Sequence, residues 1–266
     1  MTALREACIE LAQRAGEAIM AVYARDFEVE FKGDDSPLTR ADMASHHVIV
    51  DGLRALAPDI PVLSEEDAGI AWETRRRWTR HWLVDPLDGT REFVKKNGEF
   101  TVNIALVENG RPVLGVVYAP VFDDLLHAAR GEGAWLRKGD ADIAVQTRRP
   151  ATSPLRVAAS RSHLDERTAA ALGRMGEIER VGLGSSLKFC RVAEGRIDVY
   201  PRFGPTSEWD TAAAQCVLEE AGGAVLRLDG TPLDYGLKEN ILNPDFIALG
   251  DASLPWRDWL GMRADG

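Results

Sequence analysis

The sequence predicts a mixed protein, in which an α+β amino-terminal half is followed by an α/β carboxy-terminal half. Two long helical patterns come first, strands joined by short turns follow, and strand and helix patterns alternate after residue 154. The chain has 266 residues, of which 45% are hydrophobic, so it can bury a substantial core without disulfide bonds.

The first predicted elements are two helices. Apolar residues recur at spacings of three and four over residues 4–22, which is typical of a helix with one buried face. A second helical pattern covers residues 41–57 and stops at a proline. Thr39 and Asp42 are spaced as in a capping box, so we expect this helix to begin there.

A largely antiparallel sheet is expected next. Residues 101–107 and 113–118 have strand-like composition and flank an Asn109-Gly110 turn, which is a strong hairpin signal. A second glycine-containing turn at residues 131–133 leads into a strand at 134–136. The first half therefore combines helices with hairpins.

A domain boundary is predicted in the polar stretch between residues 140 and 154, and it divides the chain into residues 1–150 and 151–266. Beyond it we expect strands at 155–159, 181–184 and 197–200, and helices at 168–176, 186–194 and 211–221. The last helix is followed by Gly222-Gly223, and glycine is common at the carboxyl ends of helices. Residues 251–266 show no clear pattern.

Composition and charge exclude several classes of function. The net charge of −10 argues against a nucleic-acid polymer as partner, because such binding needs a basic surface. No apolar run approaches the roughly 20 residues of a transmembrane helix, although a peripheral association with the cytoplasmic face of a membrane stays open. The three cysteines, Cys8, Cys190 and Cys216, are too widely spaced for a zinc site or a disulfide framework, so we expect packing residues of a cytoplasmic protein.

The most informative segment is residues 82–93, in which an apolar strand ends at Asp85. A proline fixes the next turn, Asp88 comes three residues after Asp85, and Gly89-Thr90 lets a ligand approach the backbone. Two carboxylates this close repel each other unless a cation neutralises them, and oxygen ligands alone favour Mg²⁺ over zinc. The alternative is an acidic turn on the surface.

Two further acidic positions could complete such a site. Glu65 lies in the acidic cluster of residues 65–67, and Asp210 directly precedes the predicted helix at 211–221. Each also has a structural explanation, because acidic residues are common at the start of helices and Asp210 could cap the helix that follows. An acidic cap can also bind a metal, so the two interpretations of Asp210 are compatible.

Three motifs, in order and spacing, resemble the signatures of the inositol monophosphatase-like phosphatases. They are Leu-Ser-Glu-Glu-Asp at 63–67, Asp-Pro-Leu-Asp-Gly-Thr at 85–90, and Trp-Asp-Thr-Ala-Ala at 209–213 with Ala-Gly-Gly at 221–223. Residues 97–105 and 184–190 resemble the branch of 3′(2′),5′-bisphosphate nucleotidases. The resemblance covers residues 4–247 and implies the sugar-phosphatase fold, a five-layer αβαβα sandwich with the site between its two halves.

The resemblance also implies roles for individual residues. Two or three Mg²⁺ ions are expected to be held by four carboxylates and one backbone carbonyl, those of Glu65, Asp85, Asp88, Asp210 and Leu87. Thr90 is expected to orient the attacking water together with Asp42, a role that Glu65 takes in related members. No phosphoenzyme is required. For Asp42 the alternative is a purely structural helix cap.

Substrate contacts follow from the same resemblance. The reacting phosphate is expected to meet the metal ligands and the backbone N–H groups of the next turn, a set comprising Glu65, Leu87, Asp88, Gly89, Thr90 and Asp210. A second phosphate needs cations away from the metals, and Lys188 and Arg202 are the candidates, with Ser186 and His163 contributing. Lys188 could instead be a solvated helix lysine, and His163 an ordinary loop histidine.

The activity implied is Mg²⁺-dependent hydrolysis of the nucleotide bisphosphate 3′-phosphoadenosine 5′-phosphate (PAP) to AMP and phosphate, and with it hydrolysis of the corresponding phosphosulfate (PAPS), in sulfur assimilation. Sensitivity to lithium is expected of the family. The metal motifs alone also allow an inositol monophosphatase or a fructose-1,6-bisphosphatase. A non-catalytic nucleotide or metal sensor is a third alternative, and the sequence does not predict the oligomeric state.

Overall fold

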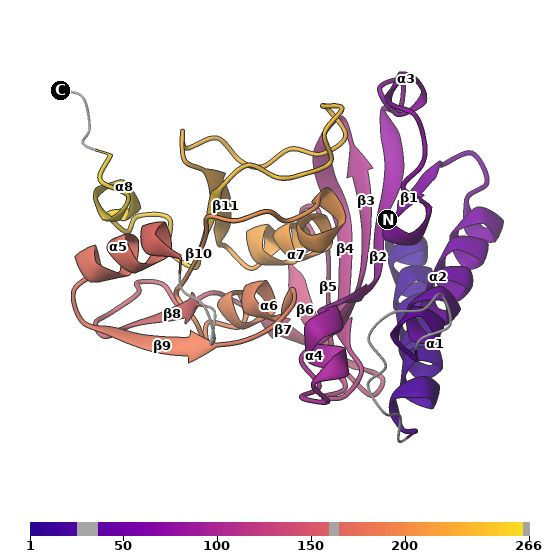
Figure 1. Ribbon diagram of the computed structural model, residues 1–266, viewed down its shortest axis with the longest axis horizontal. Helices are drawn as coiled ribbons and strands as arrows, with labels where there is room; N and C mark the ends of the chain where they lie inside the picture. Colours follow the sequence, from indigo (N-terminus) through magenta and orange to yellow (C-terminus); the bar gives the residue numbers. More distant parts are fainter. Residues whose placement is uncertain (26–36, 160–164, 263–266) are drawn as a thin grey trace.

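The computed structural model describes residues 1–25, 37–159 and 165–262, and these form five layers (Figure 1). The outer helical layers are α1 (Thr2–Tyr23) with α2 (Pro37–Leu56), and α5 (Glu166–Arg174) with α8 (Trp256–Trp259). The central helical layer is α6 (Leu187–Ala193) with α7 (Glu208–Glu220), and a β-sheet lies on either side of it. The predicted αβαβα sandwich is confirmed.

The first sheet has seven strands in the order β1-β2-β3-β4-β5-β6-β7. They are β1 (Val62–Ser64), β2 (Arg80–Asp88), β3 (Thr101–Glu108), β4 (Arg111–Ala119), β5 (Asp124–Ala129), β6 (Ala134–Lys138) and β7 (Ala141–Val145). Only the β1–β2 pair is parallel. The predicted hairpin is β3–β4, and Asn109 and Gly110 both have the positive φ angles, 49° and 78°, that its tight turn requires.

The second sheet has five strands in the order β11-β12-β10-β8-β9. They are β8 (Leu155–Ala159), β9 (Ile178–Gly182), β10 (Val199–Arg202), β11 (Ala224–Arg227) and β12 (Phe246–Leu249). β8, β9 and β10 are parallel neighbours, as the alternating strand and helix patterns predicted. The antiparallel β11 and β12 were not predicted, because each is only four residues long and a long irregular connection separates them.

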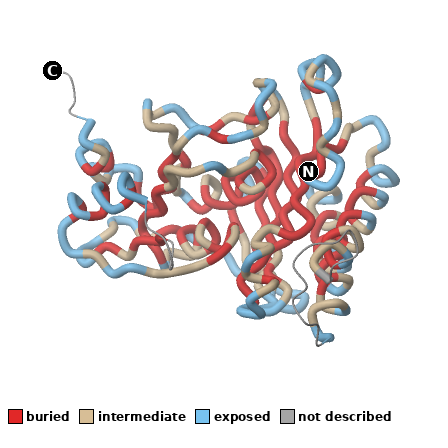
Figure 2. The backbone as a smooth tube through the Cα atoms, viewed as in Figure 1, coloured by how far each residue is buried: buried red, intermediate tan, exposed pale blue. Residues whose placement is uncertain are grey.

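The core is layered in the same way. One apolar cluster joins α1 and α2 to the first sheet, a second fills the space around α6 and α7, and a third lies beneath α5 and α8. Most of α7 is buried, as Figure 2 shows, because this helix packs between the two sheets, and even its polar Thr211 and Gln215 are buried. Helix α7 therefore packs against both sheets, and the division at residue 150 stays a prediction.

Three further details differ from the sequence expectations. Helix α2 already begins at Pro37, so Thr39 and Asp42 lie inside it and the predicted capping box is wrong. Helix α7 begins at Glu208 with Ser207 as its N-cap, so Asp210 belongs to its first turn. The polar stretch predicted as a boundary begins with the edge strand β7, whose residues are mostly exposed and therefore lack an apolar pattern.

All three cysteines are buried and free, which confirms them as packing residues. Burial raises the pKa of the Cys8 thiol to about 12, so it stays protonated and unreactive near neutral pH. Among the described residues, no helix has both the length and the apolarity needed to cross a bilayer.

Substituting Gly115→Ala is expected to disturb the contact between β4 and α7. A Cβ at this position would lie 2.2 Å from the carbonyl oxygen of Ala213 and 2.9 Å from Cβ of Cys216, both on α7. We expect the free energy of unfolding to fall by about 1–3 kcal/mol because the helix must shift. Gly173→Ala, which meets open space in α5, is the matched control and should not destabilise. Equal stability of both variants, measured by chemical denaturation, would contradict the expectation.

The stability of the protein is expected to fall below neutral pH through His81. Burial and the charge of Arg75 lower the pKa of His81 to about 4, so the folded protein holds this ring neutral while the unfolded chain protonates it near 6.5. The stabilisation is therefore present above pH 6.5 and is lost as the pH falls toward 4, by about 2 kcal/mol at pH 5. His81→Phe, which keeps a ring beside Trp78, should lose less stability than the wild type between pH 7 and 5. Parallel melting curves would argue against this role.

Candidate active site

Strand β2 delivers two acidic side chains to one end of the first sheet. Asp85 is 1% exposed, and its Oδ1 accepts a hydrogen bond of 3.0 Å from the backbone N–H of Leu87. The pairing with β3 shifts register between Asp85 and Asp88, and such a bulge redirects side chains. Ser45 on α2 donates to the carbonyl of Pro86 at 2.7 Å and fixes the turn from outside the sheet.

The chain leaves this turn through Gly89, whose φ of +96° is unfavourable for any side chain with a Cβ. Gly89 is the N-cap of the one-turn helix α4 (Thr90–Val94). A Cβ on Gly89 would also lie 3.0 Å from the carbonyl oxygen of Glu99. The glycine is therefore required both by the backbone angle and by the close approach of a neighbouring segment, and it places Thr90 at the edge of the site.

Helix α2 and the turn η1 (Glu65–Asp67) bring further carboxyl groups to Asp85. Asp42 is buried and shares a hydrogen bond with Glu66, and its Oδ1 has no partner. Burial, followed by the charges of Glu66 and Glu65, raises the pKa of Asp42 to about 8. Glu65 in turn shares a hydrogen bond with Asp85. Asp42 therefore faces the acidic site from α2 and does not cap that helix.

Asp210 approaches from the first turn of α7. Its Oδ2 accepts a hydrogen bond of 2.8 Å from the N–H of Ser207, completing a capping box that fixes the side chain. Burial, then the charge of Asp88, raises the pKa of Asp210 to about 7. The two interpretations of this residue are thus compatible, since a capping carboxylate also faces the acidic cluster.

Asp85 is the centre of this cluster. Its pKa is raised well above the usual range by burial and then by the charges of Asp88, Glu65, Asp210 and Asp42. In the part of the chain that the structure describes, no ion pair joins Asp85, Asp88 or Asp210 to a basic side chain. Carboxyl groups from α2, η1, β2 and α7 therefore approach one another, and the only basic charge that lowers the pKa of Asp210 comes from Arg202, which forms no ion pair with it among the described residues. A divalent cation is the partner that such oxygen donors favour.

The described residues hold no ready-made group of three or more acidic, histidine or cysteine side chains around a common point. Backbone N–H groups donate to one oxygen each of Asp85, Asp88 and Asp210. The donor chemistry fits Mg²⁺. The assignment of Glu65, Asp85, Asp88, Asp210 and the Leu87 carbonyl as its ligands stays a prediction.

Ser186, the N-cap of α6, forms hydrogen bonds with several residues of the site. Its N–H and Oγ both donate to Oδ2 of Asp88, at 2.6 Å and 2.8 Å, and its Oγ lies 2.6 Å from the carbonyl oxygen of Asp210. Asn103 on β3 donates to the same Oγ at 3.0 Å. Ser186 is only 1% exposed. Its side chain therefore contacts protein groups on three elements, and this arrangement favours a role in positioning Asp88.

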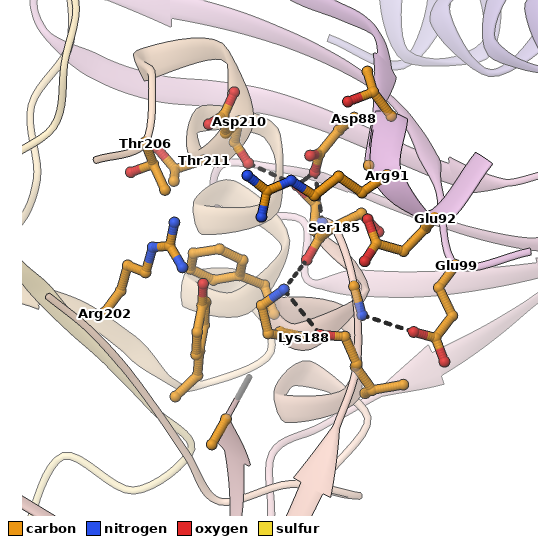
Figure 3. Close-up of a pocket in the computed structure, with 18 of the residues that line it drawn as sticks. Asp88, Arg91, Glu92, Glu99, Ser185, Lys188, Arg202, Thr206, Asp210 and Thr211 are labelled. Carbon is orange, nitrogen blue, oxygen red and sulfur yellow. Dashed lines mark hydrogen bonds between the residues drawn. The ribbon is translucent and has the colours of Figure 1, made fainter. Parts of the chain in front are cut away.

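Asp88 and Asp210 also border a cavity of about 810 Å³ between the two halves (Figure 3). Gly89 and Thr90 line it, as do Lys188 and Arg202. The Lys188 amine donates to the carbonyls of Leu183 and Ser185 at 3.2 Å and 2.9 Å, and Arg202 donates to the carbonyl of Pro205 at 3.0 Å. The structure thus brings the carboxylates and the predicted phosphate contacts to one place. His163 lies outside the described residues.

Sequence reasoning missed three residues of this region. Asn103 could have been found, because it is the one amide in the apolar strand pattern at residues 101–107. Glu99 accepts a hydrogen bond of 2.9 Å from the N–H of Gly184 and so links the two halves, and Arg91 lines the cavity next to Thr90. Neither has a local signal, since each depends on contacts between distant segments.

A site of this construction, in this fold, is that of a metal-dependent phosphatase, and the comparison with known families agrees. The model of the inositol monophosphatase family matches residues 1–252, and the chain belongs to that family.

Within this family, the chain is similar to several bisphosphate nucleotidases. The chain is 55% identical over 245 residues to the 3′(2′),5′-bisphosphate nucleotidase CysQ of Salmonella typhimurium, covering 91% of this chain and 98% of the relative. It is 54% identical over 239 residues to the protein of the same name from Escherichia coli K12, covering 89% and 96%. The crystal structure of CysQ from Bacteroides thetaiotaomicron matches with a TM-score of 0.84 and 42% identity, over 93% of this chain and 97% of that one.

Substituting Ser186→Ala is expected to weaken divalent-cation binding about 10- to 100-fold, because Asp88 loses a donor that fixes its orientation. Calorimetric titration of the metal-free protein with Mg²⁺ measures this directly. In hydrolysis assays, the loss should be recovered by raising Mg²⁺. Ser185→Ala is the control, since the Ser185 hydroxyl accepts from the N–H of Leu187. An unchanged Mg²⁺ affinity in Ser186→Ala would contradict the positioning role.

Proposed function

We propose that the protein is a 3′(2′),5′-bisphosphate nucleotidase that removes phosphate from PAP, giving AMP, and that it accepts PAPS through the same contacts. One observation carries the proposal. Asp88 and Asp210 belong to the acidic cluster around Asp85, and they also line the cavity that Lys188 and Arg202 line. The names of the most similar relatives support the same substrate class.

Mg²⁺ is the proposed cofactor, held by Glu65, Asp85, Asp88, Asp210 and the Leu87 carbonyl, in a set of two or three ions. When bound, such ions supply charge neutralisation for the phosphate and favour ionisation of water. The carboxyl groups support the binding of Mg²⁺, because the charges of their neighbours raise the pKa of Asp85 and Asp210, and bound cations would offset this repulsion.

The protein's own groups have separable roles in this proposal. The hydroxyl of Thr90, at the edge of the cavity, orients the attacking water, and the carboxyl group of Asp42 accepts its proton. Backbone N–H groups at the start of α4 donate to the oxygens of the reacting phosphate. Ser186 holds Asp88 so that its other oxygen stays available.

Hydrolysis of inositol monophosphate or fructose 1,6-bisphosphate is less well supported. Both substrates would use the same carboxylates, so these residues do not discriminate. The basic groups on the carboxy-terminal side of the cavity discriminate against inositol monophosphate, because it has no second phosphate for Lys188 and Arg202. Fructose 1,6-bisphosphate does have one, and only the names of the most similar relatives favour the nucleotide over it.

Release of inorganic phosphate under equal Mg²⁺ tests the proposal. We expect PAP to be hydrolysed with a higher kcat/KM than inositol monophosphate or fructose 1,6-bisphosphate, and hydrolysis to stop when the metal is chelated. Preference for either of the other substrates would overturn the assignment of substrate. No phosphate release from any of them would instead favour the non-catalytic sensor.

Asp88→Asn separates catalysis from folding. We expect kcat for PAP to fall about 100-fold or more, because the variant lacks one charge of the proposed donor set. The melting temperature of the metal-free protein should not fall, since the substitution removes a charge that repels Asp85 and Asp210. Unchanged turnover would contradict the role of Asp88, whatever the melting temperature.

A further inference from the structure

The cavity contains a cation that the proposed function has not yet used. Arg91 is the second residue of α4, directly after Thr90, and it lines the cavity with Lys188 and Arg202. Figure 3 shows the guanidinium groups of Arg91 and Arg202 pointing into this space from opposite sides. Arg91 comes from the amino-terminal half and Arg202 from the carboxy-terminal half, so the two groups face each other across the junction.

The side chains of Lys188, Arg202 and Arg91 differ in how many of their N–H groups already donate hydrogen bonds to the protein. Lys188 donates to two carbonyl oxygens, and burial lowers its pKa to about 8. Arg202 gives one N–H to Pro205, while its Nε is buried without a partner. Among the described residues, the side chain of Arg91 has no hydrogen-bond or ion-pair partner. Arg91 therefore offers all five donors to a ligand, and Arg202 offers most of its own.

Charge explains why a ligand should use these donors. A nucleotide bisphosphate brings a second dianionic group into a cavity that Asp88, Glu92, Glu99, Asp165 and Asp210 also line. The reacting phosphate is neutralised at the metal site, but the second phosphate has no metal. It needs cationic side chains that can reach it from the cavity walls, and the planar guanidinium fork matches phosphate oxygens in pairs.

Resting on the proposed function, we propose that Arg91 is a specificity-determining residue that binds the second phosphate of the substrate together with Arg202. The phosphate then bridges the two halves, and a nucleotide with a single phosphate at the metal site lacks this contact. Lys188 supplies positive charge nearby, but its amine is held by backbone carbonyls. Discrimination between bisphosphate and monophosphate therefore depends on a residue beside the catalytic turn as well as on the carboxy-terminal half.

Steady-state hydrolysis of adenosine 3′,5′-bisphosphate and adenosine 3′-monophosphate by Arg91→Gln tests the inference. We expect kcat/KM for the bisphosphate to fall about 10- to 100-fold, mainly through KM, because a charge-assisted contact is lost. Hydrolysis of the monophosphate should change far less. Arg91→Lys should recover part of the loss, since lysine keeps the charge without the paired donors.

Arg77→Gln is the matched control. Arg77 is exposed and lies two residues after the end of α3 (Trp72–Arg75), which is far from α4 (Figure 1). Its substitution by glutamine removes the same charge. We expect it to leave both substrates unaffected. If Arg91→Gln lowered kcat/KM equally for both substrates, Arg91 would act on the reacting phosphate, and if it lowered neither, Arg91 would not contact the substrate. Either result overturns the assignment.

A binding measurement separates this inference from the proposed function. If the wild type releases no phosphate from the bisphosphate, the proposed function is wrong. Calorimetric binding of adenosine 3′,5′-bisphosphate in the presence of Ca²⁺ then decides the role of Arg91. Weaker binding to Arg91→Gln than to Arg77→Gln would still support the contact, and equal or undetectable binding would overturn it.

Discussion

The repulsion among the carboxyl groups that gather around the buried Asp85 is the constraint on which the rest of the site depends. Burying one carboxylate is costly, and gathering several from different elements without a basic partner costs more. The fold accommodates them because backbone N–H groups bind some oxygens, as Leu87 does for Asp85 and Ser207 does for Asp210. The remaining charge is left for a ligand. A structure selected for stability alone would neutralise this cluster with lysine or arginine.

The position of α7 explains how two sheets can build one site. This helix packs on β3 and β4 of the first sheet and on β11 of the second, so the Asp210 carboxylate moves only if the central layer moves. Gly115 permits the closest part of this contact, since a side chain there would collide with Ala213. Ser186 adds a polar connection, because its hydroxyl contacts Asp88, Asn103 and the backbone of Asp210. Apolar packing sets the distance between the halves, and hydrogen bonds set the orientation of the ligands.

Local signals in the sequence were enough for much of the fold. The helical periodicity of residues 4–22, the Asn109-Gly110 hairpin and the glycines after α7 all act within a few residues and were all confirmed. The start of α2 was wrong because Thr39 and Asp42 imitate a capping box, whereas Asp42 faces the acidic site. Short strands such as β11 depend on distant partners, so no local pattern predicts them. The sequence identified the individual carboxylates as candidate metal ligands, but only the three-dimensional structure shows which of them lie close to one another.

The same limit applies to Ser186, whose contact with the substrate stays a prediction while the structure adds a contact with Asp88. In the sequence, a contact between Ser186 and the substrate is implied only by the resemblance of residues 184–190 to the bisphosphate nucleotidases. In the structure the hydroxyl is 1% exposed and oriented toward Asp88, so the start of α6 supports the metal-site carboxylate. Ser186 also lines the cavity, together with the longer side chains of Lys188 and Arg202. The position of α6 and the orientation of Asp88 are therefore linked, because the N–H and hydroxyl groups of Ser186 both donate to the same carboxylate oxygen.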